Sequence, residues 1–384
     1  MRGLIIMNDK EAREIRRRFK PDKTWINAVH GCYVNESKKV ISTFRESVQT
    51  MVQDESERFL ALLKKPISGT IGRNLINLEF SARQVMESEE HKLLMAMRAC
   101  GLENEELLAA FYNRVAQTLN IDGGYIILLV HDTYSVPYRS SDGHAQHDAS
   151  DEEFSYFICS ICPVKQTQPV LSYQLAENCF NALNNGFAVS APQLGFMFPA
   201  FDNRAANIYA TLYYTKSTAD NHPEFTTAVF GIEPPMPAAS QKEVFSEILS
   251  EALEEECRIE TVQSVQEHIG QIMEMHKESR AEEPLALSKN ELGAVLGQCG
   301  VSAERVQAFS DAFDAHFGTD AALPPMNMID KKQFVITTPE VTVKVDPERS
   351  DMIELRKIDG LKYILIPADD VVEVNGVKVQ FGEK

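Results

Sequence analysis

His131 and Asp132 follow a strongly apolar segment and form the clearest pair of catalytic type in this sequence of 384 residues. An imidazole can act as a general base that a carboxylate orients, and active sites often lie where strands give way to loops. Adjacent side chains in an extended strand point to opposite faces, however, so these two cannot share one proton directly. A hydrogen-bonded structural histidine is the alternative interpretation. The sequence contains no Gly-x-Ser-x-Gly, His-Glu-x-x-His or dinucleotide-binding motif in support of catalysis.

The polar segment 139–153 contains residue types that bind metal ions. The candidate ligands are His144, His147 and Asp148. A loop rich in glycine and serine seldom holds a metal ion without ligands from elsewhere in the fold, so an ordinary solvated loop is the competing interpretation. The sequence therefore gives a candidate metal site, and the cofactor, if any, stays unknown.

Cys159 and Cys162 have the spacing of a zinc or redox site. Both lie in an apolar segment that reads as a strand, where positions three apart point to opposite faces. A single Cys-x-x-Cys without a second pair is also a weak signal. We therefore interpret these residues as packed thiols of the core.

Basic residues near the start of the chain, and one arginine far from them, are candidate anion-binding residues. They are Arg16, Arg17, Arg18, Lys20 and Arg204. The first four cluster at the end of a predicted helix over residues 9–19, where the helix dipole stabilises cations. Arg204 lies in a predicted turn, which it can brace by pairing with Asp202. These structural roles are the alternatives to binding an anion or a phosphate.

Composition places the chain among ordinary globular proteins. The hydrophobic fraction is 44%, and the seven cysteines are an odd number scattered through apolar segments, as expected of reduced thiols in a cytoplasmic protein. No apolar run is long enough to span a membrane. The net charge of −18 disfavours diffuse binding to nucleic acid or to an anionic membrane. The basic residues near the N-terminus could nevertheless form a local basic patch.

The predicted centre of the fold is a pair of apolar strands within residues 124–138 and 154–164. In the first, Tyr125, Ile127 and Leu129 alternate with residues that are equally apolar, so both faces of the strand are covered. The second repeats this pattern. Leu194–Phe198 lies between Pro192 and Pro199, which suggests an edge or bulged strand. A capping box of Ser81 and Gln84 predicts a helix from Ser81 to about Cys100. A short helical piece is predicted to reach about Ala182.

The second part of the chain differs in composition. A proline-rich linker at residues 233–239 separates predicted domains at 1–235 and 239–384. The later domain begins with amphipathic helices that are rich in glutamate and ends with predicted β-hairpins, one of which turns at Asn375-Gly376. The sequence thus predicts an α+β protein with a mixed β-sheet core flanked by helices, followed by a helical module and C-terminal β-hairpins.

Several segments together resemble a family of uncharacterised intracellular bacterial proteins defined only as a domain of unknown function. The segments are Glu14–Lys23, Gly31–Glu36, Ser88–Met95, Phe154–Lys165 and Leu194–Lys216. This resemblance covers nearly the whole chain and implies no site or substrate. The order of predicted elements is also similar to that of acidic nucleoid-associated proteins of bacteria, a likeness of element order alone.

Two classes of function follow from these observations. The preferred one is a non-catalytic cytoplasmic binding protein, nucleoid-associated in type, with nucleic acid as a partner and with a homo-oligomeric state. The alternative is a hydrolase-like enzyme with a polar site around His131 and Asp132 at the ends of the central strands. The basic entry helix and the acidic later module favour the first.

Overall fold

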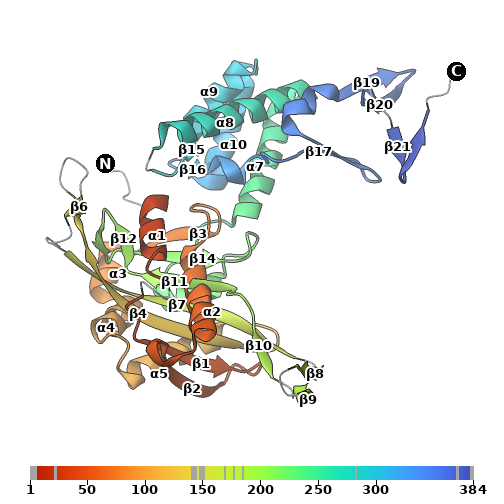
Figure 1. The fold of residues 1–384 in the computed structure, drawn as a ribbon. Helices are drawn as coiled ribbons and strands as arrows, with labels where there is room; N and C mark the ends of the chain where they lie inside the picture. The colour runs from red at the N-terminus through yellow and green to blue at the C-terminus, as the bar shows by residue number, and fades with distance from the viewer. Residues whose placement is uncertain are drawn as a thin grey trace. The chain divides into compact units, whose positions relative to one another are not determined.

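The computed structural model describes residues 7–20, 24–139, 145–146, 152–167, 170–175, 178–183, 186–281, 283–368 and 372–380. The chain divides into two compact units (Figure 1). The first contains residues 1–240 and 282–284, and the second contains residues 241–281 and 285–384. Helices accompany a large sheet in the first unit, and helices are followed by hairpins in the second, so the predicted α+β class is confirmed.

The first unit is built on one eight-stranded sheet with the order β2-β1-β4-β7-β11-β14-β3, to which β10 adds by pairing with β7. The strands are β1 (Ala28–Val34), β2 (Val40–Ser47), β3 (Leu75–Glu79), β4 (Tyr125–Val136), β7 (Glu152–Gln166), β10 (Phe187–Val189), β11 (Leu194–Phe198) and β14 (Ala210–Thr215). All strand pairings recorded in this sheet are antiparallel, whereas the sequence suggested a mixed sheet.

The two central strands are buried on both faces, as predicted. Ile127 and Leu129 of β4 belong to one hydrophobic core, and Leu128 and Val130 belong to the other. Cys159 and Cys162 of β7 divide between these two cores in the same way. The alternation of apolar residues in both registers of a strand therefore placed the centre of the fold correctly.

Helices cover each face of this sheet. The first core is closed by α4 (Glu89–Ala99), α5 (Glu105–Thr118) and α6 (Pro223–Phe230), and the second by α1 (Asp9–Arg16) and α2 (Gln53–Lys64). A single helix was predicted from Ser81 to about Cys100. The structure instead has α3 (Ala82–Glu87) and then α4, because Ser88 is extended and its side chain caps the new helix at His91 N.

Two predictions near residues 170–200, one of an edge strand and one of a helix, were wrong. β11 is central rather than an edge strand, since it lies between β7 and β14 and all its residues are buried. Its flanking prolines stand outside the strand and leave its backbone donors intact. The helical piece expected up to Ala182 is instead β9 (Cys179–Leu183), paired with β8 (Val170–Gln174). A cross-strand contact between the Tyr173 and Phe180 rings, with centroids 4.9 Å apart, supports this hairpin.

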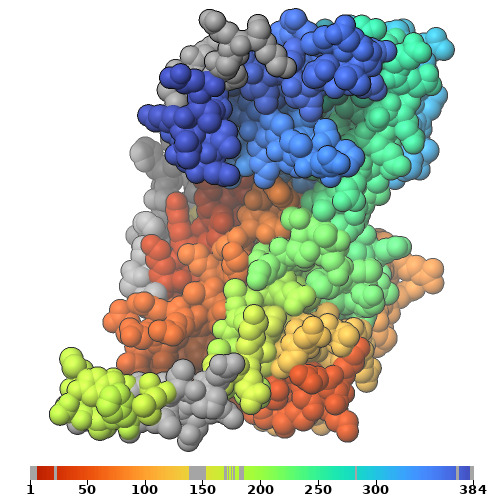
Figure 2. Space-filling view, turned by 90° about the vertical axis from the view of Figure 1, so that its right-hand side faces the viewer, coloured from red at the N-terminus to blue at the C-terminus, as the bar shows by residue number. Residues whose placement is uncertain are grey.

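The β8–β9 hairpin extends beyond the sheet (Figures 1 and 2). Short strands complete the first unit: β5 (Tyr138–Arg139), β6 (Ala145–Gln146), β12 (Ala200–Asp202) and β13 (Ala205–Asn207). Single-turn 3₁₀ helices are η1 (Val48–Thr50) and η2 (Lys65–Ile67).

The second unit has its own hydrophobic core, formed by helices. These are α7 (Ala238–Leu253), α8 (Ile259–Ser279), α9 (Lys289–Gln298) and α10 (Ala303–Phe317), with η3 (Glu254–Glu256), η4 (Pro325–Asn327) and η5 (Pro347–Met352) as short 3₁₀ segments. One short two-stranded sheet of this unit joins β15 (Leu287–Ser288) to β16 (Ala322–Leu323) across α9 and α10. Three hairpins follow it: β17 (Phe334–Thr337) with β18 (Thr342–Val345), β19 (Glu354–Ile358) with β20 (Leu361–Leu365), and β21 (Val372–Val374) with β22 (Val377–Val379). Among the helices described in both units, none combines the length and the apolar character needed to cross a membrane.

Candidate functional site

Helix α1 is held in place by its own sequence and by the sheet below it. The Asn8 side chain accepts hydrogen bonds from Lys10 N and Glu11 N, and the Glu11 side chain accepts one from Asn8 N, which completes a capping box. Ala12 and Ile15 are fully buried in the core that α1 closes. This packing brings the polar face of the helix to the end of β4.

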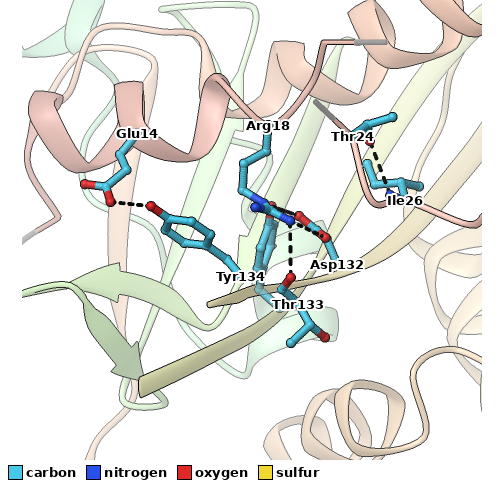
Figure 3. A network of polar contacts seen from close by, with 8 residues as sticks. Glu14, Arg18, Thr24, Ile26, Asp132, Thr133 and Tyr134 are labelled. Carbon is cyan, nitrogen blue, oxygen red and sulfur yellow. Dashed lines mark hydrogen bonds and ion pairs between the residues drawn. The ribbon is translucent and has the colours of Figure 1, made fainter. Parts of the chain in front are cut away.

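The centre of the site is a two-point ion pair between Arg18, in the turn that directly follows α1, and Asp132 of β4 (Figure 3). Arg18 Nε lies 2.6 Å from Asp132 Oδ2, and Arg18 Nη2 lies 2.9 Å from Asp132 Oδ1. The same carboxylate accepts a hydrogen bond of 2.8 Å from the Tyr156 hydroxyl. Only 1% of the Asp132 side chain is exposed, so its charge is neutralised by this arginine and not by solvent.

Tyr134 links this ion pair to a second one. The Arg18 Cζ atom lies over the Tyr134 ring, 4.7 Å from the ring centroid, in a cation–π arrangement. The Tyr134 hydroxyl donates a hydrogen bond of 2.7 Å to Glu14 Oε1. Glu14 in turn binds Arg204, whose Nη1 lies 2.8 Å from Glu14 Oε2. Arg204 Nη2 also donates to the carbonyl of Pro137. The result is a continuous polar network that connects α1, β4, β7 and the β12–β13 turn.

The environment of this network suppresses ionisation of its phenols. Burial, followed by the neighbouring Asp132, holds the pKa of Tyr156 well above its usual value. Burial and the hydrogen bond to Glu14 raise the pKa of Tyr134 to about 12. Both tyrosines are therefore neutral hydrogen-bond donors at physiological pH. Both oxygens of Asp132 also accept hydrogen bonds, so the network stabilises the packing of the N-terminal segment on β4 and β7.

His131 and Asp132 are not brought together. The His131 side chain faces the other side of the sheet, where its Nε2 lies 2.9 Å from Ser155 Oγ. Arg98 Nε donates to the backbone carbonyl of the same serine at 2.7 Å. Burial lowers the pKa of His131, with Arg98 contributing in the same direction, so the imidazole is neutral at pH 7. The chemical partner of His131 is thus a serine hydroxyl.

The candidate anion-binding residues separate into two groups. Arg18 and Arg204 are engaged by Asp132 and Glu14, and the turn that Arg204 was expected to brace uses another contact, from Asn207 Nδ2 to Asp202 Oδ2. Arg16 bonds back to the carbonyl of Ala12 in its own helix. Arg17 and Lys20 are exposed to solvent.

The predicted thiol pair behaves as core residues. Cys159 and Cys162 are fully buried on opposite faces of β7, and burial holds the pKa of Cys159 well above its usual value and raises that of Cys162 to about 12. The candidate metal ligands His144, His147 and Asp148 lie outside the residues that the structure describes. Within the described part of the chain, no cluster of three or more histidine, cysteine, aspartate or glutamate side chains could hold a metal ion.

Sequence reasoning missed four members of these two sites: Glu14, Tyr134, Ser155 and Tyr156. Tyr134 lies two residues after Asp132 in β4, and Tyr156 of β7 pairs with Asp132, so all three side chains project from the same face of the sheet. This shared face was the signal available in the sequence. Ser155 offers a similar signal, because it lies on the face of β7 that matches His131 of β4. Glu14 had no local signal, since its partners come from distant segments.

Comparison with known proteins supplies a family but no activity. No curated protein matches the chain. A family model described as a domain of unknown function, DUF4317, matches residues 7–377. The match spans both units and almost the whole sequence, in agreement with the resemblance found in the sequence. The chain therefore belongs to the DUF4317 family, a domain of unknown function.

Proposed function

We propose that this protein is a non-catalytic binding protein of the nucleoid-associated type, with nucleic acid as a partner held through α1. The observation that carries the proposal is the Arg18–Asp132 ion pair. It anchors the C-terminal end of α1 to the sheet through the arginine of the following turn, while other cations of this segment stay at the surface. A rigidly held basic helix is suited to contacts with a phosphate backbone.

The exposed cations of this segment share one side. Lys10, Arg13 and Arg17 are exposed and follow one another at spacings of three and four residues, which places them on one face of a helix, and exposed Lys20 comes just beyond. We call these four residues the basic stripe. In a chain with a net charge of −18, a local stripe of this kind supports recognition of a phosphate backbone independently of base sequence.

A mobility-shift assay across a salt series tests this proposal with duplex DNA. We expect the full-length protein to bind at low salt, and the double variant Arg13→Ala/Arg17→Ala to lower the salt slope by about two, since each phosphate contact contributes roughly 0.9. The matched control is Lys38→Ala/Lys39→Ala, which removes the same charge from an exposed turn. Absence of binding at low salt, or equal slopes for both double variants, would refute the DNA proposal.

Two further expectations accompany this proposal, a cytoplasmic location and a homo-oligomeric state. The seven cysteines are scattered along the chain, and Cys32, Cys159 and Cys162 are buried in the core as thiols, which supports a reducing compartment. Fractionation of native cells tests the location, and light scattering coupled to gel filtration tests the oligomeric state.

A second candidate function is a hydrolase, because Ser155 Oγ and His131 Nε2 lie at hydrogen-bond distance. In this proposal the neutral imidazole of His131 accepts the proton of Ser155 while the serine oxygen attacks an ester carbonyl carbon. The ester C–O bond then breaks, the leaving alcohol takes the proton from the imidazolium, and water hydrolyses the acyl-serine. Asp132 cannot orient His131, because the Asp132 side chain lies on the opposite face of the sheet and is bound by Arg18. The site thus has a nucleophile and a base without the acid of a triad.

Substrate screening with ester probes tests the second candidate. We expect Ser155→Ala and His131→Ala each to abolish any activity found. Ser135→Ala, which changes an exposed serine of the same strand β4, is the control and should retain activity. An activity that survives both Ser155→Ala and His131→Ala would exclude this site as its source.

A further inference from the structure

A cavity of about 430 Å³ lies in the first unit between the β1–β2 hairpin and the start of α5. Its volume falls within the range of small-molecule sites in proteins. The cavity involves neither the basic stripe nor the Ser155–His131 pair. It is therefore a separate feature from both candidate functions.

Strand register and helix periodicity explain why these side chains surround one space. His30 pairs with Arg45 in the β1–β2 ladder, so both project from the same face of the sheet, toward α5. On α5, Glu105, Leu108 and Tyr112 follow at helical spacing and line the opposite wall, together with Ala109. The α5 wall is thus mainly apolar apart from Glu105, whereas the β1–β2 wall has Phe44 beside the polar His30, Thr43 and Arg45.

The charges around the cavity are predominantly negative. Arg45 Nη2 binds Glu103 Oε1 at 2.6 Å, and both side chains are more than half exposed, so this pair lies on the solvent side. Glu105 adds a second carboxylate, which forms no ion pair with any residue that the structure describes. The N-terminal dipole of α5, equivalent to about half a positive charge, offsets only part of that charge. His30 is buried, and burial together with Arg45 lowers its pKa, so it contributes no positive charge at pH 7.

The wall formed by α5 also contains an unsatisfied polar group. Tyr112 lines the cavity and is only 2% exposed, and its hydroxyl has no hydrogen-bond partner among the residues described. Buried polar groups are normally paired. This hydroxyl is itself sealed from solvent and lies toward Cys32 and Cys159 in the core, so Tyr112 offers the cavity its ring and not its hydroxyl.

We propose that this cavity binds a small primary amine with an apolar body, whose ammonium group meets Glu105 and Glu103 while its body packs on Leu108, Ala109 and Tyr112. An ammonium ion is preferred over a carboxylate because two carboxylates and one arginine surround the opening. The apolar wall provides most of the contact area, and the acidic residues provide the selectivity.

Isothermal titration of the full-length protein with two probes of similar body tests the proposal. The probes are 2-phenylethylamine and 3-phenylpropionate. We expect the amine to bind saturably and at least about tenfold more tightly than the acid. Equal binding, preference for the acid, or no heat from the amine at millimolar concentration would overturn the proposal.

Paired substitutions on α5 locate the binding site. Ala109→Phe places a large side chain in the cavity from an exposed position, and Ala110→Phe makes the same change at the next exposed residue, which does not line it. We expect only Ala109→Phe to abolish amine binding. Likewise, Glu105→Gln should weaken binding about tenfold while Glu106→Gln leaves it unchanged. Circular dichroism of each variant verifies folding, and amine binding that survives Ala109→Phe would refute the site.

Discussion

Arg18 and Asp132 form a two-point ion pair across 114 residues of sequence, with nitrogen–oxygen distances of 2.6 and 2.9 Å. Asp132 is buried, whereas the Arg18 side chain is 13% exposed. The pair attaches the turn after α1 to the two longest strands of the sheet, since the same carboxylate also accepts a hydrogen bond from the Tyr156 hydroxyl of β7. The position of α1, and with it the direction of the basic stripe, depends on this contact.

Removing the arginine alone should be strongly destabilising. Arg18→Met leaves Asp132 buried without its counter-charge, and we expect a loss of about 3–5 kcal/mol in the free energy of unfolding of the first unit. Urea unfolding followed by circular dichroism measures this loss. The double variant Arg18→Met/Asp132→Leu should recover part of it, because no unpaired charge remains.

Arg83→Met is the matched control for that experiment. It breaks the ion pair with Glu87, in which both side chains are mostly exposed, and is expected to cost less than about 1 kcal/mol. A loss for Arg18→Met as small as that for Arg83→Met would show that the Arg18–Asp132 pair does not anchor α1.

The stability of the first unit should fall as the pH is lowered below about 6.5. Burial depresses the pKa of His131 below its unfolded value, so below pH 6.5 the unfolded chain binds more protons than the folded one. The contribution is complete above pH 6.5 and is lost as the pH falls toward the folded pKa. His131→Gln, which does not titrate, should flatten the profile of unfolding free energy below about pH 6.5.

His30 provides an independent test of the same reasoning. Its pKa is also lowered, first by burial and then by Arg45. The variant His30→Gln/His131→Gln should therefore show a flatter profile than either single variant. An unchanged slope in the double variant would mean that neither histidine is protonated on unfolding in this range.

Three thiols should be unreactive in the native protein. Cys32, Cys159 and Cys162 are fully buried, and burial raises the pKa of Cys32 and of Cys162 to about 12, so the reactive thiolate is scarce at pH 8. Alkylation with iodoacetamide followed by mass spectrometry should modify them only after addition of urea. Rapid native modification of Cys159 would contradict its place in the core.

Gly195 should not tolerate a methyl group. A Cβ atom there would lie 2.4 Å from the backbone oxygen of Cys159 and 2.7 Å from Cγ of Pro66, so β11 or its neighbours must shift. We expect Gly195→Ala to destabilise the first unit by about 1–3 kcal/mol in urea unfolding. Gly270→Ala is the control. A Cβ at Gly270 meets nothing within 4 Å on helix α8, and the substitution should stabilise by about 0.5–1 kcal/mol.

Local patterns in the sequence predicted the elements that depend on near neighbours. The β4 and β7 strands, the opposite faces of Cys159 and Cys162, and the N-terminal helix follow from side-chain alternation and capping, which act over a few residues. The split between α3 and α4 was missed although Ser88 is itself a capping residue. A capping residue inside a stretch of helical periodicity can either start a new helix or lie within a continuous one, and the packing of the helices decides between the two.

The candidate site was only partly predictable, because its residues gain their roles from distant partners. His131 and Asp132 were singled out together, yet one bonds Ser155 and the other bonds Arg18, on opposite faces of the sheet. Alternation along the strand separates them, and strand pairing and helix docking then select the partner of each. The central position of β11 likewise depends on pairing with β7 and β14, which its flanking prolines could not reveal.

The sequence by itself determined the α+β class, the doubly buried central strands, the basic helix and the buried thiols, since each depends on periodicity or composition. Only the tertiary structure decided which charges pair, that Ser155 meets His131, and that β1, β2 and α5 enclose a cavity. These contacts join residues far apart in the chain, and their formation depends on the packing of whole elements and not on any short pattern.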